Sequence, residues 1–238
     1  GVNLTRVAGR WAFRTAGDLA PHLRIEVKVP RKLSRAAVET LARSGATVLV
    51  TVDCGIDGYE EVCLAQELGM DVIITDHHLP HDGVPNAVAS LNPKIPGGNY
   101  PFLDLCGAGL GFKLIQGLFE FYGQPWDPGL LELAALGTIA DLVPLVDENR
   151  YLVQQGLLEL AKTKRPGLKA LYRRAGVNRE GINTETASFQ IAPRLNSPGR
   201  MSHAIDSYKL LTTTSDDEAE DLADRLETMN QDRRNLTE

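Results

Sequence analysis

The sequence has few cysteines and no long apolar run. Its three cysteines are an odd number without Cys-x-x-Cys spacing, which argues against a disulfide framework or a zinc knuckle. We therefore expect a reducing compartment, the cytoplasm. No run reaches the roughly 18 apolar residues of a membrane span. The first residues carry Arg6 and Arg10 without an apolar signal core. The sequence thus predicts neither secretion nor a membrane partner.

An excess of positive charge is also lacking. The chain has 25 Lys and Arg against 31 Asp and Glu, a net charge of -6. This balance argues against a generally basic surface that coats nucleic acid, but a local basic patch on an acidic protein can still bind a polyanion. With 43% hydrophobic residues among 238, the chain can bury one large core or two modest ones. We expect a soluble globular protein, and a DNA substrate remains open.

Apolar runs alternate with helical patterns in the first half of the chain. Residues 46–52 and 71–75 are predicted strands, and the β-branched composition of 46–52 predicts burial on both faces, as in parallel sheets. Residues 58–68 form an amphipathic pattern between them, which predicts a right-handed strand–helix–strand unit. Before this unit, Ser34 is placed to cap a helix that ends at Gly45.

Helical patterns dominate the second half. After a further strand at 87–91, we predict helices at 109–122, 128–140, 150–162, 167–175, 202–212 and from 216 onward. The predicted fold class is α/β. A parallel β-sheet flanked by helices covers 1–145, a mostly helical part of the same core covers 146–214, and 215–238 begins a connector helix to a second domain. We expect the apolar stripe of this connector, which includes Leu222 and Leu226, to be exposed.

Three apolar segments end in side chains that bind metals: Asp53; Asp76, His77 and His78; and Asp141. In open α/β sheets, ligands bind at the carboxyl ends of the strands. Carboxylates with imidazole suit Mn²⁺ or Mg²⁺, and two such ions could polarise a phosphodiester. A single Asp at a strand end is more often a turn or cap residue. Packing alone, however, does not require a carboxylate and two imidazoles side by side.

Two other segments could bind phosphate. Gly107–Gly111 resembles a phosphate loop, but no clear strand precedes it and no lysine closes it, so a tight helix start against the sheet is the better interpretation. In Pro193–Arg200, two arginines bracket Asn196 and Ser197 in a predicted loop. Guanidinium groups bind phosphate oxygens bidentately, which suggests a phosphate clamp. Alternatively, these arginines cap helix ends or pair with Asp206.

Together, these segments resemble the DHH phosphoesterases, and within them the RecJ-type single-strand-specific exonucleases. Thr51–Ile56, Thr75–His78 and Gly137–Asp141 are similar to the second, third and fourth family motifs. Cys106–Gly109 and Ala192–Arg200 are similar to RecJ-type segments. The resemblance covers nearly the whole chain.

The resemblance implies a set of roles. Asp53, His77 and Asp141 would bind a pair of Mn²⁺ or Mg²⁺ ions, with Asp76 bonded to a ligand or a metal. His78 would face the scissile phosphate. Substrate phosphates would be held by Arg194, Asn196 and Arg200. The implied reaction is 5′→3′ hydrolysis of single-stranded DNA to 5′-mononucleotides in repair and recombination. Single-strand-binding proteins and helicases are the implied partners, and no oligomeric state is indicated.

The sequence departs from the family in two places. The first family motif, Asp-x-Asp-x-Asp-Gly, does not occur, and by position Gly1 could be its terminal glycine. Without those aspartates a second ion lacks carboxylates, so we expect this chain alone to be poorly active. A Gly-Tyr-Gly loop is also absent before Ser34. The alternatives are a catalytically silent DHH-fold protein that acts as a DNA-binding or replication scaffold, and a phosphodiesterase for short oligonucleotides.

Overall fold

The computed structural model describes residues 2–7, 10–15, 33–201 and 204–236. The chain divides into two compact units, 1–31 and 32–238. In the first unit, strands β1 (Val2–Val7) and β2 (Arg10–Thr15) pair as an antiparallel hairpin. Two departures from the family are predicted near residues 16–32 and at Gly1. Both places lie outside the described residues.

The second unit contains a three-stranded parallel sheet in the order β3-β4-β5. Its strands are β3 (Val48–Val52), β4 (Asp71–Thr75) and β5 (Ala89–Leu91). Val52 pairs with Thr75, and Thr75 with Leu91, so the three strands end level with one another. The predicted strand–helix–strand unit is confirmed, and the level ends determine where the side chains that follow each strand meet.

Helices α1 (Arg35–Arg43) and α2 (Tyr59–Glu67) cover one face of this sheet. The predicted start of α1 is confirmed, because the Ser34 hydroxyl accepts a 3.2 Å hydrogen bond from the amide of Ala37. Gly45 follows the helix with φ +85°, a conformation that glycine adopts without strain. A shared apolar core joins the two helices to the sheet through Val38, Leu49, Val62, Ala65, Val72 and Ile74.

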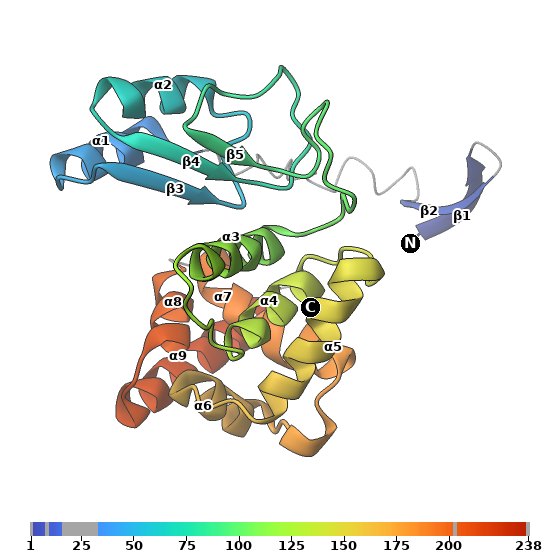
Figure 1. Cartoon of the computed structure of the whole chain (residues 1–238). Helices are drawn as coiled ribbons and strands as arrows, with labels where there is room; N and C mark the ends of the chain where they lie inside the picture. Colours follow the sequence, from blue (N-terminus) through green and yellow to red (C-terminus); the bar gives the residue numbers. More distant parts are fainter. Residues whose placement is uncertain (1, 8–9, 16–32, 202–203, 237–238) are drawn as a thin grey trace. The chain divides into compact units, whose positions relative to one another are not determined.

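The prediction that the strand at 46–52 is buried on both faces is wrong, because one face of β3 is exposed. Val48, Val50 and Val52 are 52%, 43% and 51% exposed. Within the described residues β3 is an edge strand, and helix α3 (Gly107–Phe121) approaches it near Val52, where a Cβ on Gly111 would lie 3.7 Å away. Figure 1 shows α3 between the sheet and the remaining helices. The β-branched residues indicate a strand correctly, but they do not indicate which faces of that strand are covered by other elements.

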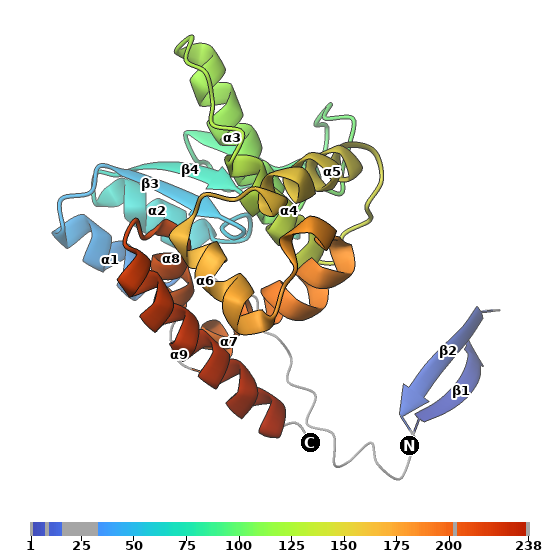
Figure 2. The ribbon, with the colours of Figure 1, turned by 90° about the horizontal axis from the view of Figure 1, so that it is seen from below.

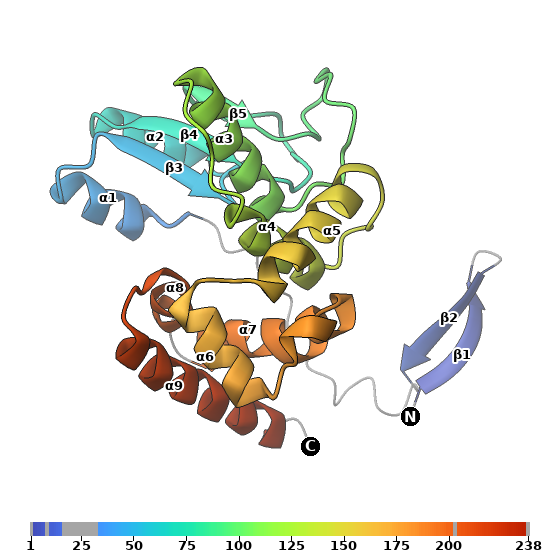
Figure 3. The same cartoon turned by 60° about the horizontal axis from the view of Figure 1, so that its bottom comes forward.

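The remaining helices form a second layer with its own core. They are α4 (Leu130–Ala140), α5 (Asp147–Ala161), α6 (Pro166–Ala175), α8 (Ile205–Thr212) and α9 (Asp216–Asn235), in agreement with the predicted helical patterns. Figure 3 shows α4 and α5 packed side by side, with α6 and α9 below them. Because α4 packs on α5, and α9 on α6, no gap in packing marks the proposed divisions at 145 and 214, which stay predictions.

The predicted loop at 193–200 is wrong, because this segment is helical. A short 3₁₀ turn (Arg179–Gly181) and a π-helical turn (Thr186–Ile191) lead into α7 (Ala192–Met201). Pro198 cannot donate to the carbonyl of Arg194 four residues earlier. The Ser197 hydroxyl donates to that carbonyl instead, at 2.7 Å. A side chain thus replaces the missing backbone bond, which a local reading of Pro and Gly does not reveal.

The predicted exposure of the α9 stripe is also wrong. Leu222, Ala223 and Leu226 are at most 3% exposed and belong to the helical core. Figure 2 shows α9 alongside α6, α7 and α8, and it packs against all three. Acidic residues in its first turn, after the Ser215 cap, stabilise its start. In the described part of the chain, no helix combines the length and apolarity that crossing a membrane requires.

Candidate metal centre

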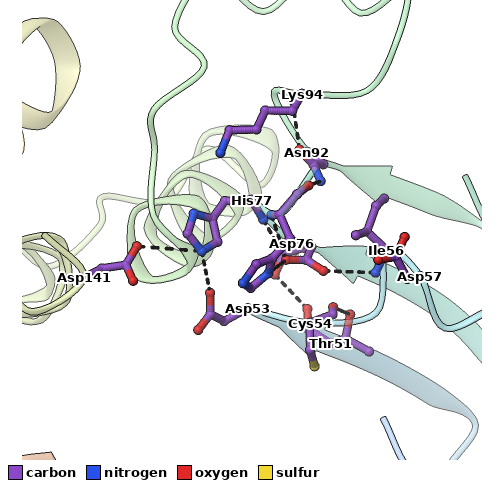
Figure 4. Close-up of polar contacts among 12 residues, drawn as sticks. Thr51, Asp53, Cys54, Ile56, Asp57, Asp76, His77, Asn92, Lys94 and Asp141 are labelled. Carbon is purple, nitrogen blue, oxygen red and sulfur yellow. Dashed lines mark hydrogen bonds and ion pairs between the residues drawn. The ribbon is translucent and has the colours of Figure 1, made fainter. Parts of the chain in front are cut away.

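The level strand ends bring two of the predicted site segments together. The amide of Asp53 donates to the Thr75 carbonyl at 2.9 Å, and the amide of Asp76 donates to the Leu91 carbonyl at 3.1 Å. The sheet ladder therefore extends one residue past the strands. This places Asp53 and Asp76 beside each other at the carboxyl edge, with His77 next to them (Figure 4). His78 follows His77 in the sequence.

Asp76 organises this edge from a buried position. Only 1% of the residue is exposed. Its Oδ1 accepts hydrogen bonds from the amides of His77 (2.8 Å) and His78 (3.2 Å) and from Nδ1 of His78 (2.7 Å). Its Oδ2 accepts from the amide of Ile56 at 3.0 Å. Both oxygens accept hydrogen bonds, so the geometry favours Asp76 as a residue that orients a ligand, and its contact with a metal stays a prediction.

The contact with Asp76 also determines which nitrogen of His78 is available. A carboxylate only accepts hydrogen bonds, so Nδ1 of His78 carries the proton that bonds Asp76. In the neutral ring, the other nitrogen, Nε2, then keeps a lone pair that can bind a metal ion. A carboxylate behind a histidine in this manner fixes the tautomer of metal-binding histidines.

His77 lies between two acidic residues. Its Nε2 is 3.1 Å from Oδ1 of Asp53 and 3.7 Å from Oδ2 of Asp141, and the His77 side chain is 12% exposed. The hydrogen bond to Asp53 is the main cause that raises the pKa of His77, against the opposing effect of burial. Burial raises the pKa of Asp141, and the charge of His77 opposes that rise. Asp141 reaches this position from the C-cap of α4.

Three side chains satisfy the geometry of a metal site. Asp53, His77 and His78 each offer one ligand atom, and these atoms lie within 4.8 Å of one another. Asp141 is outside this group, but its carboxylate faces the same Nε2 of His77 as Asp53 does (Figure 4). The side chains of Asp53 and Asp141 are 57% and 41% exposed, so the site is open to a substrate. Asp53, with Asp141 nearby, offers the carboxylate oxygens that Mn²⁺ and Mg²⁺ prefer, and the imidazoles add nitrogen donors. His78, assigned by resemblance to the phosphate, thus also has the position of a ligand.

The backbone that presents Asp53 is closely confined. Asp53 has φ +65°, a conformation that a non-glycine residue adopts rarely but that Asp tolerates. Gly107, the first residue of α3, packs against it, since a Cβ there would lie 2.4 Å from Asp53 Oδ1. The preferred interpretation of Gly107–Gly111 as a tight helix start is therefore confirmed. The Thr51 hydroxyl donates to the Cys54 carbonyl at 2.7 Å and fixes the turn from the other side.

The predicted phosphate-binding residues on α7 have different surroundings. Arg194 pairs with Glu227 of α9 and donates to the Gln190 carbonyl at 2.7 Å, so its guanidinium joins two helices. Among the described residues, neither arginine pairs with Asp206, which forms an ion pair with Arg225 instead. Asn196 and Arg200 are exposed on α7. Contact of Arg194, Asn196 and Arg200 with substrate phosphates stays a prediction.

Sequence reasoning missed two residues beyond the third strand. Asn92 follows β5, and its Nδ2 donates to the His78 carbonyl at 2.8 Å. Its Oδ1 accepts a 2.8 Å hydrogen bond from the amide of Lys94. Figure 4 shows the Lys94 side chain extending toward His77. The rule that identified Asp53 and Asp76, a polar residue directly after a strand, also applies to Asn92 after the predicted strand at 87–91.

A parallel sheet with a carboxylate and two imidazoles at its strand ends defines an α/β protein with a candidate site for a divalent metal. The family model described as the DHH family, N-terminal domain, matches residues 7–138. This chain belongs to the DHH family. The predicted fold class and the predicted family are both confirmed.

Two curated relatives are named single-stranded-DNA-specific exonuclease RecJ. The Bacillus subtilis protein is 44% identical over 200 residues, which are 84% of this chain and 25% of that protein. The Escherichia coli protein is 38% identical over 216 residues, which are 86% of this chain and 37% of that protein. The chain therefore spans between about a quarter and two-fifths of the length of these relatives.

Solved structures of RecJ are similar in both sequence and fold. The crystal structure of RecJ in complex with Mn²⁺ from Thermus thermophilus has a TM-score of 0.77 and 33% identity, and the match covers 84% of this chain and 30% of that one. A structure of exonuclease RecJ bound to manganese has a TM-score of 0.78 and 32% identity over 86% of this chain and 51% of that one. Those proteins bind the ion that the donor set here suits.

Proposed function

We propose that this chain is the metal-binding core of a 5′→3′ exonuclease that hydrolyses single-stranded DNA to 5′-mononucleotides in repair and recombination. The observation that carries the proposal is the meeting of Asp53, His77 and His78 within 4.8 Å at the level strand ends. The relatives and solved structures, whose names specify single-stranded DNA and manganese, support the same reaction.

We assign different roles in this reaction to the side chains of the site. Asp53 and His77 would hold an ion, with Asp141 beside them. The carboxylates of Asp53 and Asp141 are partly exposed, which leaves room for a phosphodiester. When bound, Mn²⁺ or Mg²⁺ would polarise a phosphate oxygen and lower the pKa of an attacking water. Asp76 orients His78 through Nδ1, and this leaves Nε2 of His78 toward either the ion or the phosphate.

The setting of this activity belongs to the same proposal. The cytoplasm is supported by Cys54, Cys63 and Cys106, which are all free thiols. Helicases and single-strand-binding proteins are proposed as partners because they expose and cover the substrate.

The test uses the full-length product of the gene that encodes this chain. Single strands blocked by phosphorothioates at either the 5′ or the 3′ end are incubated with Mn²⁺, Mg²⁺ or EDTA. We expect mononucleotides from 5′-open strands with metal only, and loss of release in His77→Ala. The matched control is His81→Ala, because His81 is exposed, pairs with Asp57 and lies outside the metal-competent group.

Different outcomes separate the alternatives. Intact 5′-open strands in both metals, with retained DNA binding, would refute the exonuclease and favour the scaffold. Cleavage of two-residue substrates together with intact long strands would instead indicate a short-oligonucleotide phosphodiesterase.

A further inference from the structure

Lys94 places a positive charge near Asp53, His77 and His78. It lies in a turn that side-chain hydrogen bonds of Asn92 hold in place. The turn follows β5, and Asn92 bonds both to the His78 carbonyl and to the amide of Lys94. Pro93 between them is buried. The backbone of Lys94 is therefore tied to the segment that carries His77 and His78, and the side chain starts from a defined position.

The ammonium group of Lys94 has no ion pair among the described residues, although its side chain is half-buried. Figure 4 shows it directed toward His77. The electrostatics agree with this direction. The Asp53 hydrogen bond raises the pKa of His77, and Lys94 opposes that rise. Burial raises the pKa of Asp141, and Lys94 opposes that rise as well. Lys94 is thus close enough to influence both side chains.

A cation in this place does not assist a metal ion, because like charges repel. It suits the other component of the reaction, a phosphodiester that carries negative charge. Lysine binds phosphate as a point charge and needs no bidentate geometry. The side chains of Asp53 and Asp141 are partly exposed, so a phosphate from solution can reach this edge of the sheet.

We propose that Lys94 is a substrate-binding residue that contacts a phosphate of the single strand next to the bond to be cleaved. This inference rests on the proposed function and adds a contact outside the metal-competent group. It assigns to β5 a role that complements the ends of β3 and β4: the first two strands present ligands, and the third presents the charge for the substrate.

The test measures binding without turnover. In EDTA, the affinity of the full-length protein for a fluorescent oligothymidylate is followed by anisotropy from 50 to 300 mM salt. One lost phosphate contact reduces the slope of log affinity against log salt by about 0.7 for single strands, which corresponds to about fivefold weaker binding at 0.1 M salt. We expect this change in Lys94→Met and near wild-type behaviour in Lys94→Arg. Lys164→Met is the matched control, since Lys164 is exposed on a loop before α6.

A second readout separates substrate binding from a structural role. Mn²⁺ affinity, measured by titration, should not weaken in Lys94→Met, whereas the KM for the single strand should rise more than kcat falls. An unchanged salt slope, an equal loss in Lys164→Met, or a parallel loss of Mn²⁺ affinity would overturn the proposal.

The two proposals fail in different ways. A wild-type protein that binds the oligonucleotide in EDTA but never cleaves it with metal refutes the exonuclease, while the slope test of Lys94 still applies. A protein that cleaves the strand but shows no slope change in Lys94→Met refutes the role of Lys94 alone. Absence of both oligonucleotide binding and cleavage by the wild-type protein, in EDTA and with metal alike, would refute both.

Discussion

Replacing Gly107 by alanine should weaken metal binding although the residue has no side chain to offer. The added Cβ would lie 2.4 Å from Oδ1 of Asp53, and also 2.5 Å from its Cβ. To restore a separation of about 3.0 Å between this Cβ and Oδ1 of Asp53, one of the two groups must move by about 0.6 Å. This displacement exceeds the roughly 0.5 Å within which a functional site tolerates misplacement. Asp53 cannot yield easily, because its φ is already +65°.

The magnitude follows from the role of Asp53. Displacing groups that orient a metal ligand typically costs about 10- to 100-fold in metal affinity. We therefore expect Gly107→Ala to bind Mn²⁺ about 10- to 100-fold more weakly. At saturating wild-type concentrations, this change removes about 1.4 to 2.7 kcal/mol of the stabilisation that Mn²⁺ provides. Calorimetric titration with Mn²⁺ and thermal unfolding with and without the ion measure both quantities.

Two positions on the same helix provide controls. A Cβ on Gly111 would make an ordinary 3.7 Å contact with Val52, and one on Gly117 would meet nothing within 4 Å. Gly→Ala at either position should keep wild-type Mn²⁺ affinity and stabilise the helix by up to about 1 kcal/mol. Wild-type Mn²⁺ affinity in Gly107→Ala would refute the reasoning, as would an equal loss in Gly111→Ala.

Two further predictions concern stability, measured by urea unfolding without metal. Asp76→Asn should cost about 1–3 kcal/mol, because an amide nitrogen in place of Oδ2 leaves the Ile56 amide without its acceptor; wild-type stability would contradict the role of Asp76. Ser197→Ala should also cost about 1–3 kcal/mol, because the Arg194 carbonyl, to which Pro198 cannot donate, loses the Ser197 hydroxyl. An unchanged midpoint in Ser197→Ala would show that this carbonyl has another partner.

Local sequence determined the elements and the chemistry of the site. Ser34 and Gly45 bounded the first helix, and the β-branched run ending at Val52 indicated a strand. Asp76, His77 and His78 directly after a predicted strand indicate a metal site from the sequence alone. These inferences succeed because capping, periodicity and strand-end position are properties of neighbouring residues.

The tertiary structure decided which residues meet and which faces are covered. Asp53 and Asp76 are neighbours because their strands end level, and Asp141 joins them from the end of a helix. Four hydrogen-bond donors surround Asp76, three of them from His77 and His78, and these contacts favour an orienting role. The stripe on α9 is buried and the outer face of β3 is exposed because burial depends on what packs there. Such contacts join residues distant in sequence, and no local pattern encodes them.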